Sequence, residues 1–178
     1  MTAIQKTFDS AEIWTILEGI KDPEIPVLSI VDLGIARDVR VHDAKAQDAG
    51  NSENGQLEII ISPTYSGCPA MYMLEQEIRK TLTNHGYPTP MITTSLSPAW
   101  TTDWMTEEGK RKLEAYGIAP PEKTTRNKAV LFGGQKKIAC PKCKSTNSEQ
   151  ISEFGSTACK ALYRCRDCKE PFDYFKCI

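Results

Sequence analysis

The sequence predicts an α+β protein in which a small mixed sheet packs with helices and is followed by a small β zinc ribbon. Over residues 1–118, hydrophobic patterns occur in the order helix, strand, strand, helix, strand, helix. Six of the seven cysteines lie in the last quarter of the chain, which is typical of a metal-stapled unit in a reducing compartment. We therefore expect one domain over residues 1–118, a linker over 119–136 and a metal-stapled domain over 137–178.

The composition is that of a soluble globular protein, with 40% hydrophobic and 25% charged residues. No apolar run approaches the roughly 18 residues that a membrane-spanning helix needs, and the N-terminus lacks the apolar segment of a secretory signal. We therefore expect a cytoplasmic protein without a membrane partner. Charge is unevenly divided along the chain. Residues 123–178 hold 12 Lys+Arg and 5 Asp+Glu, whereas residues 1–122 hold 10 Lys+Arg and 18 Asp+Glu. The basic tail indicates either a partner surface or a lysine-rich surface that keeps a small domain soluble.

The first predicted elements are a helix and a hairpin. Residues 8–20 place their apolar side chains on one helical face, and Asp9 can cap the N-terminus. Residues 35–42 alternate in polarity and predict a half-buried strand, although Arg37 falls on the apolar side of the alternation. The apolar run 57–62 predicts the partner strand.

Further along the chain, a helix, a strand and a second helix are expected. Pro69 suits the first turn of a helix, and Gly86 can end that helix. Residues 91–96 predict a third strand. The following loop, 97–105, holds two tryptophans that either cover a core or mark a contact surface, and we expect a cover. Residues 106–116 predict a short helix.

One cysteine, Cys68, stands where a predicted strand gives way to turn residues just before a predicted helix. Backbone N–H groups and the dipole at a helix N-terminus stabilise a thiolate, so this position predicts a reactive cysteine. No histidine lies near Cys68 in the sequence, which argues against a thiol enzyme. Three carboxylates, Asp22, Glu24 and Asp32, flank a proline-containing loop. They could line a metal or partner site or cap turns, and their spacing favours capping.

Two C-x-x-C pairs in the tail, with 21 residues between them, predict a metal site. Each pair can grip one metal ion from a tight turn, and two such turns close a tetrahedral site. Zinc suits four soft thiolates, and the long gap between the pairs favours zinc over the alternative, an iron–sulfur cluster. The two remaining cysteines, Cys159 and Cys177, could be small core residues, redox partners or auxiliary ligands, and we expect Cys159 to be a core residue. The predicted ligands are Cys140, Cys143, Cys165 and Cys168.

Basic residues alternate with aromatic ones in the same tail, a pattern that could meet phosphate groups. The net charge of the whole chain, −1, argues against nucleic acid as a partner.

Several motifs resemble those of the SufT-like metal–sulfur cluster assembly family. The resemblance lies in Asp22-Pro23-Glu24-Ile25-Pro26, in the segment 30–35 and in Thr64-Tyr65-Ser66-Gly67-Cys68-Pro69, and it extends through the segment 100–105. With the cysteine-rich tail added, the chain is similar over its whole length to the family of D subunits of phenylacetyl-CoA oxygenase, the ring 1,2-epoxidase of phenylacetate degradation. The resemblance implies a SufT-like domain over residues 1–118 and a Cys₄ zinc ribbon over 137–178.

This resemblance implies an accessory role rather than ring epoxidation, with the oxygenase and reductase subunits as partners. The chain also lacks the Glu-x-x-His helices of a di-iron carboxylate site. The implied role is maturation or repair of an iron or iron–sulfur centre, with Cys68 as a transient ligand of iron or a cluster. Asp22, Glu24 and Asp32 would shape or neutralise that site, and the zinc ribbon would supply docking. The alternative is a structural or docking subunit in which Cys68 only packs.

Overall fold

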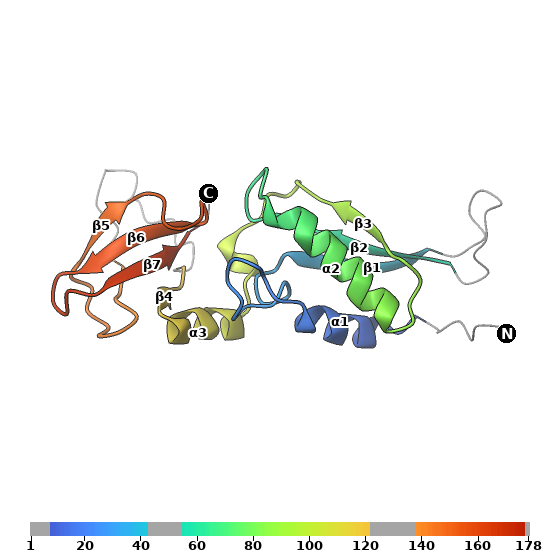
Figure 1. The fold of residues 1–178 in the computed structure, drawn as a ribbon, viewed down its shortest axis with the longest axis horizontal. Helices are drawn as coiled ribbons and strands as arrows, with labels where there is room; N and C mark the ends of the chain where they lie inside the picture. The colour runs from blue at the N-terminus through green and yellow to red at the C-terminus, as the bar shows by residue number, and fades with distance from the viewer. Residues whose placement is uncertain (1–7, 43–54, 122–137, 177–178) are drawn as a thin grey trace. The chain divides into compact units, whose positions relative to one another are not determined.

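The computed structural model describes residues 8–42, 55–121 and 138–176, and it confirms the α+β class (Figure 1). The chain divides into two compact units, Met1–Trp100 and Thr101–Ile178. Each unit has its own sheet, so each is described by itself.

The first unit is built on a mixed three-stranded sheet in the order β1-β2-β3. Strands β1 (Ala36–His42) and β2 (Gln56–Ile61) pair antiparallel as the predicted hairpin. Strand β3 (Met91–Thr94) pairs parallel with β2, and helix α2 (Ala70–Asn84) makes the crossover between them. Because β2 and β3 run in the same direction, the segments that follow them leave the sheet at the same end.

A β-bulge explains why Arg37 breaks the predicted alternation of β1. Ala36 lies opposite Ile61, but the next pair is Asp38 with Ile60, so Arg37 is the extra residue of the strand. A bulge shifts the alternation of side chains between the two faces by one residue. Side chains therefore alternate regularly between the two faces of the sheet before Arg37 and again after it, with one break at the bulge.

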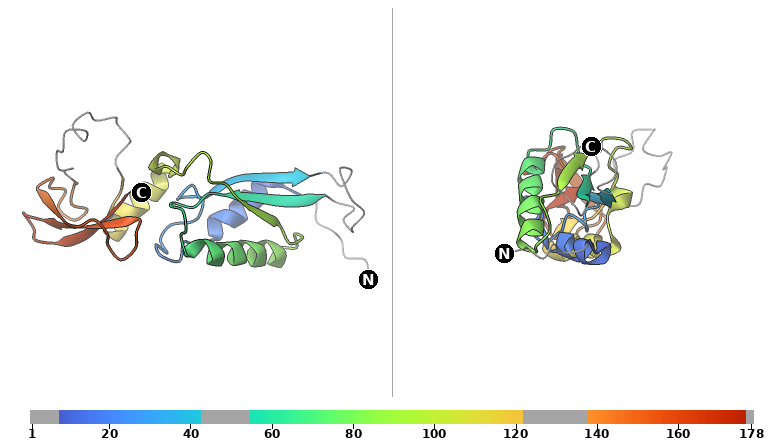
Figure 2. Two further views of the ribbon diagram at one scale, coloured as in Figure 1. Left: turned by 90° about the horizontal axis from the view of Figure 1, so that it is seen from above. Right: turned by 90° about the vertical axis from the view of Figure 1, so that its right-hand side faces the viewer.

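Helix α1 (Ser10–Gly19) begins at the predicted cap, because the Asp9 carboxylate accepts hydrogen bonds from the backbone N–H groups of Ala11 and Glu12. The helix contacts α2 and β1, and both helices pack against the sheet (Figure 2). The core of the unit contains residues from the two helices and from the central strand. Its fully buried side chains include Ile13, Leu17, Leu57, Ile59, Ile61, Leu74 and Ile78.

The second unit contains a four-stranded sheet in the order β4-β7-β6-β5. Helix α3 (Glu107–Tyr116) confirms the predicted helix and ends at Gly117, whose φ of 92° lies in the left-handed region that favours glycine. The other elements are η1 (Thr102–Trp104), β4 (Ile118–Ala119), β5 (Ser148–Ser152), β6 (Lys160–Cys165) and β7 (Pro171–Phe175).

Strand β4 pairs parallel with β7, through Ile118 opposite Asp173, so α3 and β4 fall in the second unit. The sequence alone placed them in the first domain, and the division at residues 118 and 136 stays a prediction. Most of the predicted linker lies outside the described residues. Within the described ranges, no helix has both the length and the apolar character needed to cross a membrane.

Candidate functional site

Cys68 lies at the N-terminus of α2, as the sequence predicted. The backbone N–H of Cys68 donates to the Tyr65 carbonyl over 3.3 Å, and the Met71 N–H donates to the Cys68 carbonyl over 3.2 Å. Gly67 allows this tight turn because its φ of 82° is one that residues with a side chain rarely adopt. Pro69 occupies the N-cap and gives no side-chain cap to the helix. The turn therefore presents a half-exposed thiol two residues before Ala70, the first helical residue.

The expectation of a stabilised thiolate at Cys68 is wrong. Burial raises the pKa of the Cys68 thiol, while hydrogen bonds from the Ala70 backbone N–H and from the Tyr65 side chain lower the pKa by less. The negative charges of Glu24 and Asp22 raise the pKa further. At neutral pH the thiol is therefore protonated, and Cys68 does not act as an activated nucleophile.

The same carboxylates show how the structure brings separate parts of the chain together at Cys68. Asp22 and Glu24 lie in the proline-containing loop, more than 40 positions earlier in the sequence, yet their charges act on the thiol. Sequence reasoning missed Tyr65, which hydrogen-bonds the thiol from three positions earlier. The spacing within the turn could have indicated that contact, since a turn brings residues i and i+3 together.

Asp22 and Asp32 shape the proline-containing loop, as their spacing favoured. The Asp22 carboxylate accepts hydrogen bonds from the N–H groups of Glu24 and Ile25 at 2.9 and 2.8 Å. Asp32 and Ser29 cap each other, because each side chain accepts from the backbone N–H of the other residue, at 3.0 and 2.9 Å. Both carboxylates are buried. They therefore hold the loop in one conformation while adding negative charge to it.

Trp100 covers this loop, which confirms the expected cover for one of the two tryptophans. Its indole Nε1–H donates to the Leu33 carbonyl over 3.0 Å, and its side chain is only 5% exposed. The other tryptophan, Trp104, is half-exposed. The contact of Trp100 joins two loops that lie 67 positions apart in the sequence.

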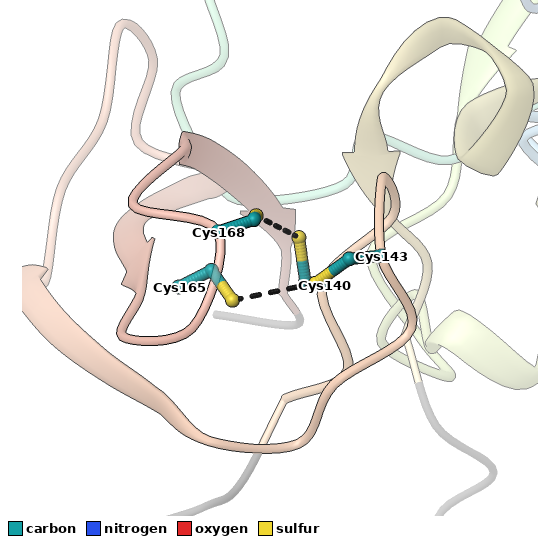
Figure 3. A group of neighbouring side chains, drawn as sticks. All are labelled: Cys140, Cys143, Cys165 and Cys168. Atoms are coloured by element: carbon teal, nitrogen blue, oxygen red, sulfur yellow. Dashed lines mark hydrogen bonds between the residues drawn. The ribbon is translucent and has the colours of Figure 1, made fainter.

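The second candidate site is the cysteine quartet of Cys140, Cys143, Cys165 and Cys168, whose sulfurs all lie within 4.8 Å of one another (Figure 3). The Sγ atoms of Cys140 and Cys168 are 3.8 Å apart, and those of Cys143 and Cys165 are 3.5 Å apart. A tetrahedral zinc site with Zn–S bonds of about 2.3 Å separates its sulfurs by about 3.8 Å. The quartet therefore fits a tetrahedral metal ion.

The two metal-gripping turns have the same backbone design. Each C-x-x-C pair is followed by a lysine with positive φ, 64° at Lys144 and 68° at Lys169. Backbone N–H groups of Cys168 and Asp167 donate to the Cys165 sulfur and lower the pKa of its thiol to about 7. A hydrogen bond from the Glu170 backbone lowers the pKa of Cys168, but burial and hydrogen bonds with the neighbouring thiols outweigh it and raise that pKa to about 12. Four thiolates this close together would repel one another, so a bound cation would stabilise the ionised quartet.

The quartet and Cys68 are different kinds of site. Among the described residues, the quartet alone brings three or more potential ligand atoms within reach of one metal ion. Cys68, Asp22, Glu24 and Asp32 are not preassembled in this way. Cys159 is buried, as expected of a small core residue, and Cys177 lies outside the described residues.

Much of the basic surface of the second unit is neutralised within the unit. Arg164 and Arg166 both pair with Glu149, and Lys142 pairs with Glu170 over 2.7 Å. This pairing reduces the positive field that binding to a phosphate backbone would need.

Comparisons with known proteins match both halves of the chain. An iron–sulfur cluster assembly protein family model matches residues 10–86, and a PaaD zinc beta ribbon domain model matches residues 124–176. A curated protein of Escherichia coli (strain K12), named as a putative D subunit of 1,2-phenylacetyl-CoA epoxidase, is 46% identical over 168 residues. That match covers 94% of this chain and 92% of the Escherichia coli protein.

Two solved structures are similar to the chain over a smaller part. A DUF59 domain from Bacillus anthracis matches 58% of this chain and 89% of its own length, with 24% identity and a TM-score of 0.49. A conserved hypothetical protein from Thermotoga maritima matches 64% of this chain and 98% of its own length, with 18% identity and a TM-score of 0.46.

Proposed function

The chain belongs to the family of 1,2-phenylacetyl-CoA epoxidase D subunits, and from this premise we propose that it matures or repairs the iron or iron–sulfur centre of the epoxidase complex. The observation that carries the proposal is the half-exposed Cys68 thiol beside the charges of Asp22 and Glu24. These three residues lie in the part of the chain that the iron–sulfur cluster assembly model matches.

Iron, alone or in a cluster, is the cargo in this proposal, and Cys68 is its transient ligand. The thiol releases its proton to solvent as the sulfur–iron bond forms, and it takes up a proton when the cargo leaves, without a change in oxidation state. The carboxylates that disfavour a bare thiolate also attract a cation, so they favour the loaded state over the free anion. The raised pKa of Cys68 means that protons compete with the metal, which favours release.

Asp32 contributes to the same proposed site through its loop. Its buried carboxylate holds Ser29 and thereby the segment that carries Asp22 and Glu24. A thiol with few fixed partners suits handover, because a complete cage of ligands would retain the metal. The lack of preassembly around Cys68 supports this proposal.

For the resident metal, we propose zinc in the cysteine quartet, held by Cys140, Cys143, Cys165 and Cys168. Bound there, zinc supplies a tetrahedral crosslink and no redox chemistry. Among the described residues, the small core beside the quartet contains eight buried members, and two of them are the proposed ligands Cys140 and Cys165. A core of this size needs a staple, so the metal stabilises the ribbon, which serves as a docking unit.

The proposal is tested by Cys68→Ala, with Ser66→Ala in the same exposed turn as the matched control. Apo oxygenase and its reductase are incubated with iron, sulfide and each variant, and the iron bound to each is measured. We expect Cys68→Ala to fold normally but to lower iron loading, while Ser66→Ala loads as the wild type does. Equal loading with Cys68→Ala would overturn the proposal.

A second candidate function is a structural subunit in which Cys68 only packs, and the protonated, half-buried thiol is the observation that favours it. In that case Cys68→Ala would support full activity of the reconstituted oxygenase. A quartet variant such as Cys143→Ala would still lower the activity, because the docking ribbon would lose its metal.

A further inference from the structure

Asp167 connects the two metal-gripping turns of the cysteine quartet. It lies inside the second C-x-x-C turn, between Cys165 and Cys168, but its side chain hydrogen-bonds residues that follow the first turn. The Ser145 hydroxyl donates to one carboxylate oxygen, and the Asn147 side-chain amide donates to the other over 2.7 Å. Both oxygens of this carboxylate therefore take part in a contact that crosses from one turn to the other.

Backbone hydrogen bonds tie Ser145 and Asn147 to the turns that they connect. The Cys140 N–H donates to the Ser145 carbonyl over 2.9 Å, which closes the first turn. The Arg166 N–H donates to the Asn147 carbonyl over 2.8 Å, and the Asn147 N–H donates to the Ser145 hydroxyl over 3.0 Å. The Asp167 carboxylate thus completes a short network of hydrogen bonds that leads from one turn to the other.

A second contact between the turns is an exposed ion pair. Lys142 pairs with Glu170 over 2.7 Å, and 64% and 45% of their side chains are exposed. Such a pair contributes little to stability, because solvent screens it and two long side chains must be ordered to form it. The Asp167 link uses a short side chain and two charge-assisted hydrogen bonds, so less side-chain entropy is lost for a stronger contact.

We propose that Asp167 is a positioning residue that holds the two turns together and thereby slows the loss of the resident metal ion. This inference rests on the proposed zinc in the quartet, since the four sulfurs fit a tetrahedral ion. Each turn supplies two of those sulfurs, so the ion leaves when one turn moves away from the other. A link that opposes this movement prolongs retention, and residues that support metal ligands in this way change metal affinity by about 10–100-fold.

Asp167 acts through the turns and not as a ligand of the ion. Both of its oxygens accept hydrogen bonds from protein donors, and the potential ligands that the described residues bring together there are the four cysteines. The link also gives the two proposed metal sites opposite properties. The quartet retains its ion, whereas Cys68, which lacks a preassembled set of ligands, releases its cargo.

The test measures the rate of zinc release from the full chain to an excess of a coloured chelator. Asp167→Ala removes the link, and the matched control Glu170→Gln removes the ion pair with Lys142. We expect Asp167→Ala to release zinc about tenfold faster than the wild type or more, and Glu170→Gln to change the rate by about threefold or less. Release by Asp167→Ala that is no faster than release by Glu170→Gln would overturn the proposal.

A double-mutant cycle separates the link from a general loss of structure. Ser145→Ala/Asn147→Ala removes the two donors, so adding Asp167→Ala should accelerate zinc release further by less than about twofold. Additive effects would overturn the proposal. Asp167→Asn, which can still hydrogen-bond both partners, should recover part of the retention. If Asp167→Ala takes up no zinc, the variant without the donors tests the same link.

Cobalt in place of zinc distinguishes a positioning residue from a ligand. The visible absorption of the tetrahedral cobalt–thiolate site should be the same in Asp167→Ala and in the wild type, because the four sulfurs are unchanged. A spectrum that changes in Asp167→Ala would make Asp167 a ligand and overturn the positioning role.

These results also separate the link from the zinc assignment. A wild type that binds no zinc, or that keeps its zinc in Cys143→Ala/Cys168→Ala, would overturn the zinc site and the positioning role with it. A wild type with about one zinc per chain, together with an unchanged release rate in Asp167→Ala, would overturn the role of Asp167 alone. Neither result depends on iron loading by Cys68.

Discussion

Replacing Trp100 with phenylalanine should destabilise the first unit, because the substitution keeps an aromatic ring but removes the indole N–H. In the wild type this N–H donates to the Leu33 carbonyl over 3.0 Å in a buried environment. Loss of the donor leaves the carbonyl buried without that partner, which costs about 1–3 kcal/mol of unfolding free energy. The smaller ring also leaves a small cavity, which adds to the cost.

This loss is large enough to measure by thermal unfolding. For a domain of roughly 100 residues, each 1 kcal/mol lowers the Tm by about 4–8 °C. The helical circular dichroism of α1 and α2 reports on this unit. The matched control is Trp104→Phe, because Trp104 lies in the same segment but is half-exposed.

We also expect Trp100→Phe to affect the candidate site itself. The indole ties the loop after β3 to the loop that carries Asp22, Glu24 and Asp32, so its loss should increase amide exchange in both loops. A Tm for Trp100→Phe within about 1 °C of the wild type, or an equal shift in Trp104→Phe, would refute this reasoning.

Three further predictions address the metal, the thiol and the sheet. Removal of the metal by a chelator should abolish the protection of amide groups from hydrogen exchange in β6 and β7 but not in β2, because structural zinc contributes about 10–16 kcal/mol to folding. Protection from exchange that persists in β6 would contradict this prediction. The rate of Cys68 alkylation by iodoacetamide should increase only at a higher pH than the rate for a free cysteine, because burial and the charges of Glu24 and Asp22 raise the pKa of the thiol. In Glu24→Gln the pH at which the rate increases should be lower, and rapid alkylation of the wild type at pH 7 would count against this prediction. Hydrogen bonds from Thr93 and His42 lower the pKa of Glu58, so its ionised form stabilises the fold above about pH 4.5 and this contribution is lost as the pH falls through the folded pKa. The difference in unfolding free energy between wild type and Glu58→Gln should therefore become smaller below pH 4.5. A difference that does not change with pH would show that ionisation of Glu58 does not stabilise the fold.

Local sequence signals predicted the elements and the quartet well, because their causes are local. Asp9 caps α1, and α2 begins directly after Pro69, since both depend on neighbouring backbone groups. The two C-x-x-C pairs indicated four sulfurs in one place, and the structure places those sulfurs within 4.8 Å. Even the irregular position of Arg37 was visible as a break in the alternation, although a break alone does not identify a bulge.

The electrostatic character of Cys68 could not be predicted in this way. Its position at a helix N-terminus suggested a lowered pKa, and the structure shows a raised one. The largest contribution is burial, and the charges of Glu24 and Asp22 add to it; both depend on how distant segments pack. For the same reason, the pairing of β4 with β7 is not visible in a two-residue strand.

The central claim is that the chain has two metal functions, a resident ion in the quartet and a transient iron ligand at Cys68. Metal analysis of anaerobically purified protein, wild type beside Cys68→Ala, tests this claim most directly. We predict about one zinc per chain in both proteins, with iron in the wild type and none in Cys68→Ala. Equal iron contents in the two proteins would contradict the role of Cys68, and a loss of zinc in Cys68→Ala would contradict the independence of the two sites.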